Sequence, residues 1–339
     1  DSSGQVTYRG LADGTRFLYF LTHGYFSPRL SIGYPVTDRI VFYFNYGHFL
    51  QFPDRDPYYR DPFGQGPSGN LVGNPNLKPQ RTVAYEAGFE DQFTDDMAIA
   101  IHAFYKDIFD YTTTIPRGSN NFYVNLDYAS VRGFEITFNQ AFTGNFSTSL
   151  SYSYQLAKGR SSDPLANIFN PQFQLPRETR LNYDQNHTAN IFTSYRVGPK
   201  EPGKFLGLPF VNNYGISLTW SFGSGFPYTP YVARTTARNV YLVNNETKPY
   251  TSTVNLSIYK GFLLMDHLNM LLTLDVIDLF NRRNVNTIFN YTGEPYKFGD
   301  VDGNNVVNIF PWRQTESRLD PTMFDSPRQF IFGVKLNWD

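Results

Sequence analysis

The sequence predicts an all-β protein, an antiparallel up-and-down transmembrane β-barrel, and three observations carry that prediction. Apolar and polar side chains alternate with a period of two along most of the chain, whereas helical periodicity is nearly absent. The links between the alternating segments are short and long in turn. Aromatic residues make up 18% of the chain and charged residues only 17%, below the roughly 25% of an ordinary soluble domain.

The alternating segments define about eleven strands. In residues 146–155, for example, aromatic, aliphatic and threonine side chains alternate with serine and glutamine, which gives one apolar and one polar face. The expected strands lie at residues 26–34, 39–47, 81–90, 97–108, 122–141, 146–156, 187–197, 212–222, 251–260, 267–278 and 328–338.

The links place the long loops at one end of the sheet. Consecutive antiparallel strands reverse direction, so every second link lies at the same end. Short links are expected at Pro35–Asp38, Asp91–Asp96, Phe142–Asn145 and Gly261–Asp266, with a longer link, 198–211, on the same side. Long links are expected at 48–80, 109–121, 157–186, 223–250 and 279–327.

The apolar face indicates a lipid environment. A water-soluble barrel would have to enclose all these rings, whereas a membrane barrel turns them toward lipid and its polar face toward the lumen. Tyr and Phe near strand ends suit the aromatic girdles at the two interfaces. A soluble sandwich or propeller is the alternative, although no 40–50-residue repeat supports a propeller. No apolar run approaches the about 20 residues that a membrane-spanning helix needs.

Composition excludes several classes of function. The net charge of −1 gives no reason to expect a nucleic-acid partner, and the absence of Cys excludes disulfides and thiolate chemistry. The first residues, DSSGQVTYRG, do not resemble a signal peptide. We therefore expect either that an export signal has been removed or that the chain is a piece of a longer protein.

No constellation of residues predicts an enzyme, and no cofactor is expected. The five His residues are scattered without metal-ligand spacing. Asp300, Asp302 and Asn304 in GDVDGNNVVN could offer oxygens to Ca²⁺, but Asp, Asn and Gly are also ordinary turn residues, and the turn interpretation is favoured.

The long loops hold the expected contacts to a solute, because aromatic rings interleaved with arginines suit stacking on a bound molecule. The alternative is that these rings pack loop against loop. The candidates are Tyr58, Tyr59, Arg60, Phe63, Arg160, Phe169, Phe173, Arg177, Tyr228, Tyr231, Trp312 and Arg313.

Several sequence strings resemble TonB-dependent outer-membrane transporters. These are GNPNLKPQRTVAYEAGFE, YVNLDYASVRGFEITFN, VIDLFNRRNV and the ending SPRQFIFGVKLNWD. The strings SPRLSIGYPVTDRIVFYFNYGHFLQFP and LNYDQNHTANIF resemble the Oar-like subgroup, whose members carry an N-terminal carboxypeptidase-regulatory-like domain. The matches span nearly the whole chain in the family's order.

The resemblance implies a barrel of about 22 strands, preceded by a plug domain and a TonB-binding segment. The chain is then expected to be the C-terminal portion of that barrel as one incomplete domain, 1–339, with the plug absent. Charged residues on the polar strand faces are expected to line the lumen and pair with one another. The resemblance further implies that Glu86, Arg132 and Glu135 help to hold the plug. It also identifies Gly333, Leu336 and Trp338 as a signal for the barrel-assembly machinery.

The expected function is that of an outer-membrane receptor of a Gram-negative bacterium, which binds a large scarce solute and imports it with energy transduced by TonB. Expected partners are outer-membrane lipid, the TonB complex, the plug, the assembly machinery and the unknown solute. The alternative is a scaffold, adhesin or export-related surface protein that uses the same barrel without active uptake. An enzyme is the least favoured class.

Overall fold

The computed structural model describes residues 8–10, 16–18, 24–60, 71–117, 120–160, 178–199, 212–230, 243–265, 267–289, 293–295, 299–301, 307–309 and 321–338. Nearly all of the regular structure is antiparallel strand, in agreement with the fold class that the sequence predicts. No helix in the described part of the chain is long and apolar enough to cross a membrane.

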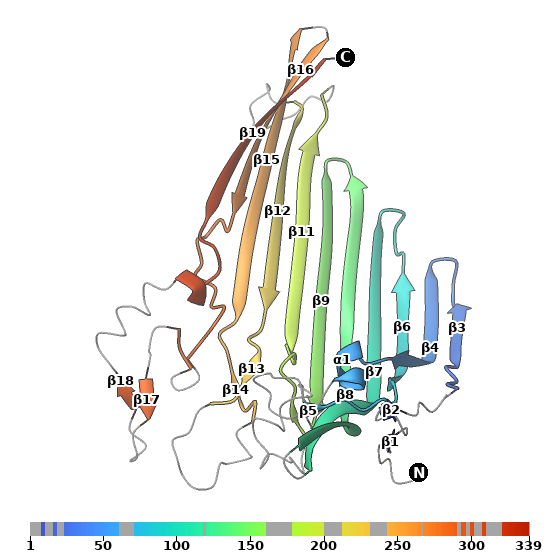
Figure 1. Cartoon of the computed structure of the whole chain (residues 1–339). Coiled ribbons are helices and arrows are strands. Elements are labelled where there is room, and N and C mark those ends of the chain that lie inside the picture. The colour runs from blue at the N-terminus through green and yellow to red at the C-terminus, as the bar shows by residue number, and fades with distance from the viewer. Residues whose placement is uncertain are drawn as a thin grey trace.

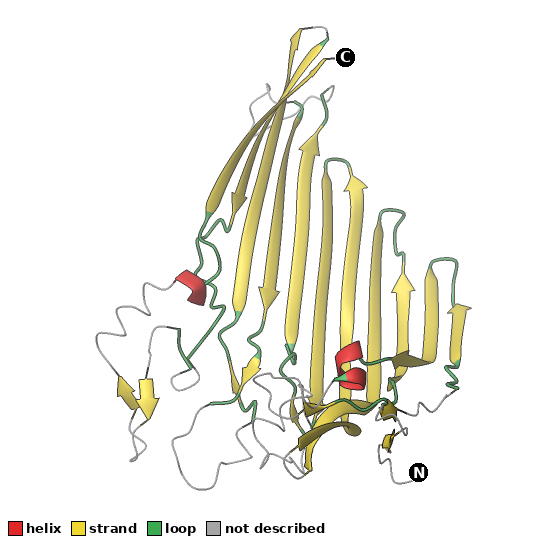
Figure 2. Ribbon diagram, in the orientation of Figure 1, coloured by secondary structure: helices red, strands yellow, loops and turns green. Residues whose placement is uncertain are grey.

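One large sheet dominates the molecule (Figures 1 and 2), and its main strands stand side by side in chain order. The strands are β3 (Arg29–Pro35), β4 (Ile40–Gln51), β6 (Gln80–Asp91), β7 (Met97–Arg117), β8 (Asn120–Thr143), β9 (Phe146–Gly159), β11 (His187–Val197), β12 (Tyr214–Gly223), β15 (Thr251–Met265), β16 (Leu268–Ile277) and β19 (Gln329–Trp338). Each corresponds to one of the predicted strands. The short connections lie at the upper end in Figure 1, and the long ones gather at the lower end.

Minor elements lie mostly at the long-loop end. β5 (Leu71–Val72) pairs in parallel with β8, and β10 (Thr179–Arg180) pairs with β9. The remaining elements are β1 (Tyr8–Gly10), β2 (Arg16–Leu18), the helix α1 (Arg55–Tyr59), β13 (Pro227–Tyr228), β14 (Glu246–Thr247), β17 (Gly299–Val301), β18 (Val307–Ile309) and the 3₁₀ turn η2 (Pro321–Met323).

The register confirms the two-faced pattern. A single row across β6, β7 and β8 carries Phe89, Ile101 and Ile136, and the next row on the same face carries Ala87, Ala103 and Phe134. Many of these side chains are exposed; Phe332 on β19, for example, is 77% exposed. The opposite face carries Ser, Thr, Asn, Gln, Gly and charged residues. We call the apolar face outward and the polar face inward.

The prediction of a long loop at 109–121 is wrong. β7 and β8 continue as a paired hairpin from Tyr111↔Asp127 to Arg117↔Asn120, after a register shift between Ile108 and Tyr111. Asp110 has a φ of 57° at this shift, so the ladder bends there and then resumes. The strands β4 and β15 also extend past their predicted ends, to Gln51 and Met265.

Two small clusters of buried residues lie at the long-loop end. One cluster joins Leu71, Leu77 and Tyr123, with Tyr58 packed against it. A second joins Ala129, Ala157 and Leu181. The sheet itself has no second layer on its apolar face among the described residues, so its large apolar side chains stay exposed to the surroundings. Such a face suits lipid as its solvent.

The sheet is open at both sides. Within the described part of the chain, β3 pairs only with β4, and β19 pairs only with β16. The outer edges of these two strands therefore carry backbone groups without a ladder partner in this part of the molecule.

The two faces can be told apart with neighbouring residues of β11. Ile191 lies on the outward face, paired with Leu150 and Trp220, whereas Asn190 lies on the inward face between Ser151 and Ser221. We expect Ile191→Arg to destabilise the protein in lipid vesicles by about 2–4 kcal/mol, because a cation near the bilayer midplane is costly. Asn190→Arg serves as the control and should change stability by less than about 1 kcal/mol. Urea unfolding of the intact protein in vesicles, followed by tryptophan fluorescence, measures both; equal effects would contradict the assignment of faces.

Candidate functional site

A row of polar groups crosses four strands on the inward face. The register aligns Tyr43 on β4, Gly88 on β6, His102 on β7 and Glu135 on β8. The Tyr43 hydroxyl and His102 Nδ1 form a hydrogen bond across β6. This contact depends on Gly88: a Cβ at that position would lie 2.7 Å from the Tyr43 hydroxyl and 2.9 Å from the His102 Cβ. On the other side of the ring, His102 Nε2 lies 3.7 Å from Glu135 Oε2.

The row forms part of an open depression of about 490 Å³ in the inward wall. Its lining comprises Ser31, Tyr43, Asn45, Glu86, Glu90, His102, Ala103, Phe104, Lys106 and Glu135. The single ammonium group, Lys106 Nζ, lies 3.6 Å from Glu86 Oε1 and offsets part of the charge. Three carboxylates against one lysine leave this wall negative, so it suits cationic side chains of a segment seated inside the sheet.

The three residues that are expected to hold the plug do not all lie on the same face of the sheet. Glu86 and Glu135 both line the depression. Arg132, in contrast, pairs with Tyr105 and Leu156 in an outward row. Residues 132 and 135 differ by an odd number along an unbroken strand, so their side chains point to opposite faces. The expectation that Arg132 lines the inward wall is therefore wrong.

The first long loop is attached to β8 through residues near the end of the loop. The side-chain amide of Asn125 on β8 makes two hydrogen bonds to the backbone of Lys78. Asn125 Oδ1 accepts the Lys78 N–H at 2.9 Å, and Asn125 Nδ2 donates to the Lys78 carbonyl at 3.0 Å. The same amide donates to the Asp110 carbonyl at 2.8 Å. Asn74 donates to the Tyr123 carbonyl at 2.9 Å. These contacts fold residues 71–79 back over the wall.

Asp127 is a buried carboxylate at the end of the wall, outside the membrane-spanning part of β8. Only 6% of it is exposed, and burial raises the pKa of its carboxyl above the ordinary value, while a hydrogen bond from Thr113 and the charge of Arg160 oppose the rise. Arg160 Nε lies 3.9 Å from Asp127 Oδ1. Arg160 is therefore positioned by Asp127 at the base of its loop.

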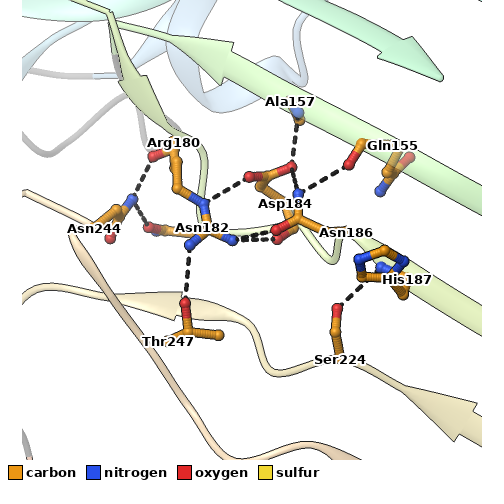
Figure 3. A network of polar contacts seen from close by, with 10 residues as sticks. All are labelled: Gln155, Ala157, Arg180, Asn182, Asp184, Asn186, His187, Ser224, Asn244 and Thr247. Carbon is orange, nitrogen blue, oxygen red and sulfur yellow. Dashed lines mark hydrogen bonds and ion pairs between the residues drawn. The ribbon is translucent and has the colours of Figure 1, made fainter.

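A second network joins two other long loops (Figure 3). Asp184 is fully buried; its Oδ1 accepts the Ala157 N–H at 2.7 Å and its Oδ2 accepts Arg180 Nε at 2.8 Å. Arg180 Nη1 donates to Thr247 Oγ1 at 2.9 Å, and Asn244 Nδ2 donates to the Arg180 carbonyl at 2.7 Å. Through Arg180, the loop after β9 is thus hydrogen-bonded to the loop after β12.

The connection continues to the next loop. Asn284 holds the start of β15, accepting the Ser252 N–H at 2.9 Å and donating to Thr253 Oγ1 at 2.9 Å. The guanidinium of Arg282 lies 4.1 Å from the centre of the Tyr250 ring. Three successive long loops are therefore fixed at their bases to the strand ends, and the first two are fixed to each other.

The structure places five of the expected solute contacts. Tyr58 packs on the Leu71 cluster, Arg60 pairs with Asp56 at 3.0 Å, and the Tyr228 hydroxyl lies against Gly293. Arg160 is positioned by Asp127, as described, and Tyr59 is 59% exposed. Seven others, Phe63, Phe169, Phe173, Arg177, Tyr231, Trp312 and Arg313, lie outside the described residues.

The remaining expected sites are placed only in part. Gly333 faces inward on β19, while Leu336 and Trp338 face outward and are 60% and 74% exposed. The backbone of Asp300 pairs with Asn308 in the β17–β18 hairpin, but Asp302 and Asn304 lie outside the described residues. No group of three or more His, Asp or Glu residues with metal-binding geometry occurs in the described ranges.

Sequence reasoning missed the Tyr43–His102 contact and the Arg180–Asp184 pair. The first depends on three strands in register around a glycine. The second had one available signal, an Arg and an Asp four residues apart just before a strand, but nothing in the sequence shows that Ala157 lies beside them.

The chain matches a protein-family model described as "TonB dependent receptor-like, beta-barrel" over residues 3–281. No curated protein matches it in sequence.

Solved structures share the fold at low sequence identity. The ferric-catecholate import receptor Fiu of E. coli is 15% identical, with a TM-score of 0.56, over 91% of this chain and 34% of that one. The ferripyoverdine receptor of the Pseudomonas aeruginosa outer membrane is 12% identical, with a TM-score of 0.56, over 96% and 33%. The ferric yersiniabactin uptake receptor FyuA of Yersinia pestis is 14% identical, with a TM-score of 0.51, over 91% and 36%. The chain thus spans about a third of the length of each.

Loss of the buried Asp184 carboxylate should lower the free energy of local opening more than loss of an exposed carboxylate does. We expect Asp184→Ala to lower the free energy of local opening at the Ala157 amide by about 3 kcal/mol, because it leaves Arg180 and that amide without their acceptor. Asp56→Ala breaks the exposed pair with Arg60 and should cost at most about 1 kcal/mol at the neighbouring amides. Amide hydrogen exchange of the intact protein, read by mass spectrometry, compares the two; a smaller effect at Asp184 than at Asp56 would refute the role given to the network.

Proposed function

The chain belongs to the family of TonB-dependent receptor β-barrels, and from this premise we propose that it forms part of a receptor that imports a large, scarce solute with energy transduced by TonB. As a member of this family it is an outer-membrane protein of a Gram-negative bacterium. The observation that carries the proposal is the pairing of an outward apolar face with an inward polar wall whose long loops all lie at one end.

We place the chain in the C-terminal portion of a larger barrel of about 22 strands. The two edges of the sheet support this proposal, because β3 and β19 each lack a second partner in the described residues and unpaired backbone groups in lipid are very costly. Further strands of the same receptor supply both partners. The Oar-like strings in the sequence support assignment to that subgroup.

The long loops are the site of solute capture in this proposal. Their bases are fixed by Asn125, Asp184 and Asn284 at the ends of the strands. Tyr59, which is 59% exposed, is the described candidate best placed for stacking on a solute. The three solved relatives bind or import iron complexes, and a ferric complex is therefore the first solute class to test.

The inward depression serves as the docking wall for the plug. Glu86, Glu90 and Glu135 give it a negative charge that suits basic plug side chains, and Lys106 limits that charge. Arg132 has no part in this wall because it faces outward. A separate proposal concerns the edge strand β19. The barrel-assembly machinery recognises this strand through Gly333, Leu336 and Trp338.

The alternatives gain no support. No observation on the described residues favours a scaffold, adhesin or export-related protein over a transporter. The matched family and the three solved relatives are receptors and importers, which supports a protein that is not an enzyme.

The partial-barrel proposal is tested by the mass of the native polypeptide. On a denaturing immunoblot of outer membranes, an antibody against residues 251–265 should detect a band at least twice the 39.0 kDa of this chain. The reason is that the proposal places the missing strands and the plug on the same polypeptide, as in single-chain, even-stranded barrels. A band at 39.0 kDa would instead place the partner strands on a different chain.

Import is tested with ⁵⁵Fe-labelled complexes of a catecholate siderophore and of pyoverdine in iron-starved cells. Cells with the intact gene should accumulate one of them, and accumulation should fall to the level of the gene deletion when TonB is removed. Glu86→Gln with Glu135→Gln should reduce this uptake while binding to whole cells persists, because the plug is held less firmly. The matched control is Asp38→Asn with Asp95→Asn, which removes two carboxylates from the short turns at the end of the sheet away from the long loops. Uptake that persists without TonB would refute energy coupling.

A further inference from the structure

His102 lies in the inward depression between a hydroxyl and a carboxylate. Its Nδ1 is hydrogen-bonded to the Tyr43 hydroxyl on β4, and its Nε2 lies 3.7 Å from Glu135 Oε2 on β8. The imidazole ring therefore links two strands of the wall that are not neighbours in the sheet. About 28% of the His102 side chain stays exposed on the inward face, so protons from the water inside the barrel have access to it.

The two ring nitrogens of His102 have different roles while the ring is neutral. One nitrogen of a neutral imidazole carries a hydrogen, and the other accepts one. The carboxylate of Glu135 favours the hydrogen on Nε2, the nitrogen that lies nearest to it. Nδ1 is then the acceptor, and the Tyr43 hydroxyl donates to it.

A second proton on the ring changes both contacts, because both nitrogens of a charged imidazole are donors. The charged ring forms an ion pair with Glu135 across the 3.7 Å that separate them. Nδ1 now donates to the Tyr43 oxygen, so the hydroxyl hydrogen of Tyr43 must turn away from the ring. Histidine is the side chain that gains its proton between about pH 8 and pH 5, so the exchange of partners falls in that range.

The carboxylates of β6 lie where the Tyr43 hydroxyl hydrogen is released. The hydroxyl packs against Gly88, at 2.7 Å from the position that a Cβ would take there. Glu86 and Glu90 are the next residues on the same face of β6, one on each side of Gly88. Both line the depression with Tyr43. A hydroxyl released by the ring thus has two carboxylates beside it as acceptors, and the one it bonds turns toward the wall.

The other polar groups of the depression keep their charge state over the same range. Lysines stay charged and glutamates stay ionised between about pH 8 and pH 5, and Lys106 Nζ lies 3.6 Å from Glu86 Oε1. Ser31 and Asn45 are uncharged and are hydrogen-bonded to each other at 2.6 Å. Among the described residues that line the depression, His102 is therefore the group whose charge changes near neutral pH.

We propose that His102 is an acid-operated switch that loosens the plug. This inference rests on the proposed docking of the plug on the inward depression. At neutral pH the three carboxylates are available to basic side chains of the plug. At acidic pH the charged ring draws Glu135 into an ion pair within the wall and repels the same basic side chains. The excess of negative charge in the described lining falls from two charges to one. The receptor then yields its plug more easily in an acidic medium.

Hydrogen exchange of the plug in the intact receptor tests the switch. The receptor is reconstituted in vesicles and read by mass spectrometry at about pH 7.5 and pH 5.5, and each rate is divided by the intrinsic exchange rate at that pH to give a protection factor. The test variant is His102→Gln, which keeps a polar side chain but cannot gain a charge. The matched control is His187→Gln. His187 Nδ1 is also bonded to a tyrosine hydroxyl, that of Tyr152 at 2.8 Å, but His187 faces outward, paired with Tyr154.

In the wild type we expect acidification to lower the protection factors of the plug roughly fivefold, which is the effect of losing about one partly exposed ion pair. His187→Gln should respond like the wild type, whereas His102→Gln should give equal protection factors at both pH values. A full pH response in His102→Gln overturns the switch. A response that is lost in both histidine variants overturns it as well, because the loss is then not specific to the inward wall.

The double variant Glu86→Gln with Glu135→Gln separates the switch from the docking on which it rests. If the plug docks on this wall, the double variant lowers the protection of the plug already at pH 7.5. Unchanged protection refutes the docking wall and the switch together. Lowered protection, combined with a full pH response in His102→Gln, refutes the switch alone. Heat-modified gel mobility verifies folding, and His102→Asn takes the place of His102→Gln if that variant does not fold.

Discussion

The need to pair every backbone N–H and C=O within a hydrocarbon layer governs this structure. Water is absent there, so the strands must form a continuous ladder, and the main strands do so in chain order. Once the ladder is set, the register decides which side chains meet lipid and which meet the interior. A shift of one residue in β6 or β8 would carry Glu86 or Glu135 into lipid.

The same constraint explains how the loops are held. Because large apolar side chains are turned toward lipid, few are left to build a core under the loops. Polar anchors take that role: the Asn125 amide clamps Lys78, and the buried Asp184 carboxylate receives a backbone amide and a guanidinium together. The interior wall uses the opposite device, a missing side chain, since Gly88 lets Tyr43 reach His102 past an intervening strand.

Strand number, order and faces could be predicted because a period of two survives in every membrane-crossing segment. Strand ends could not, since residues 112–114 are three threonines among loop-like residues, and only their pairing with β8 shows them to be strand. Arg132 was wrongly predicted to face inward on the basis of its charge. The odd spacing between residues 132 and 135, which puts them on opposite faces of a strand, was visible in the sequence. The Arg180–Asp184 anchor depends on Ala157, a neighbour that is distant in sequence, and no local pattern reveals it.

The two open edges of the sheet differ in how well they are protected. β3 is flanked by Pro28 and ends at Pro35, and a proline cannot donate to an added strand. β19, Gln329–Trp338, contains no proline and presents ten residues of uninterrupted backbone. Separated from its neighbours, a polypeptide with these edges would associate through β19 first, forming antiparallel pairs of chains and then ribbons. The order in which the edges are covered therefore decides between a closed wall and an aggregate.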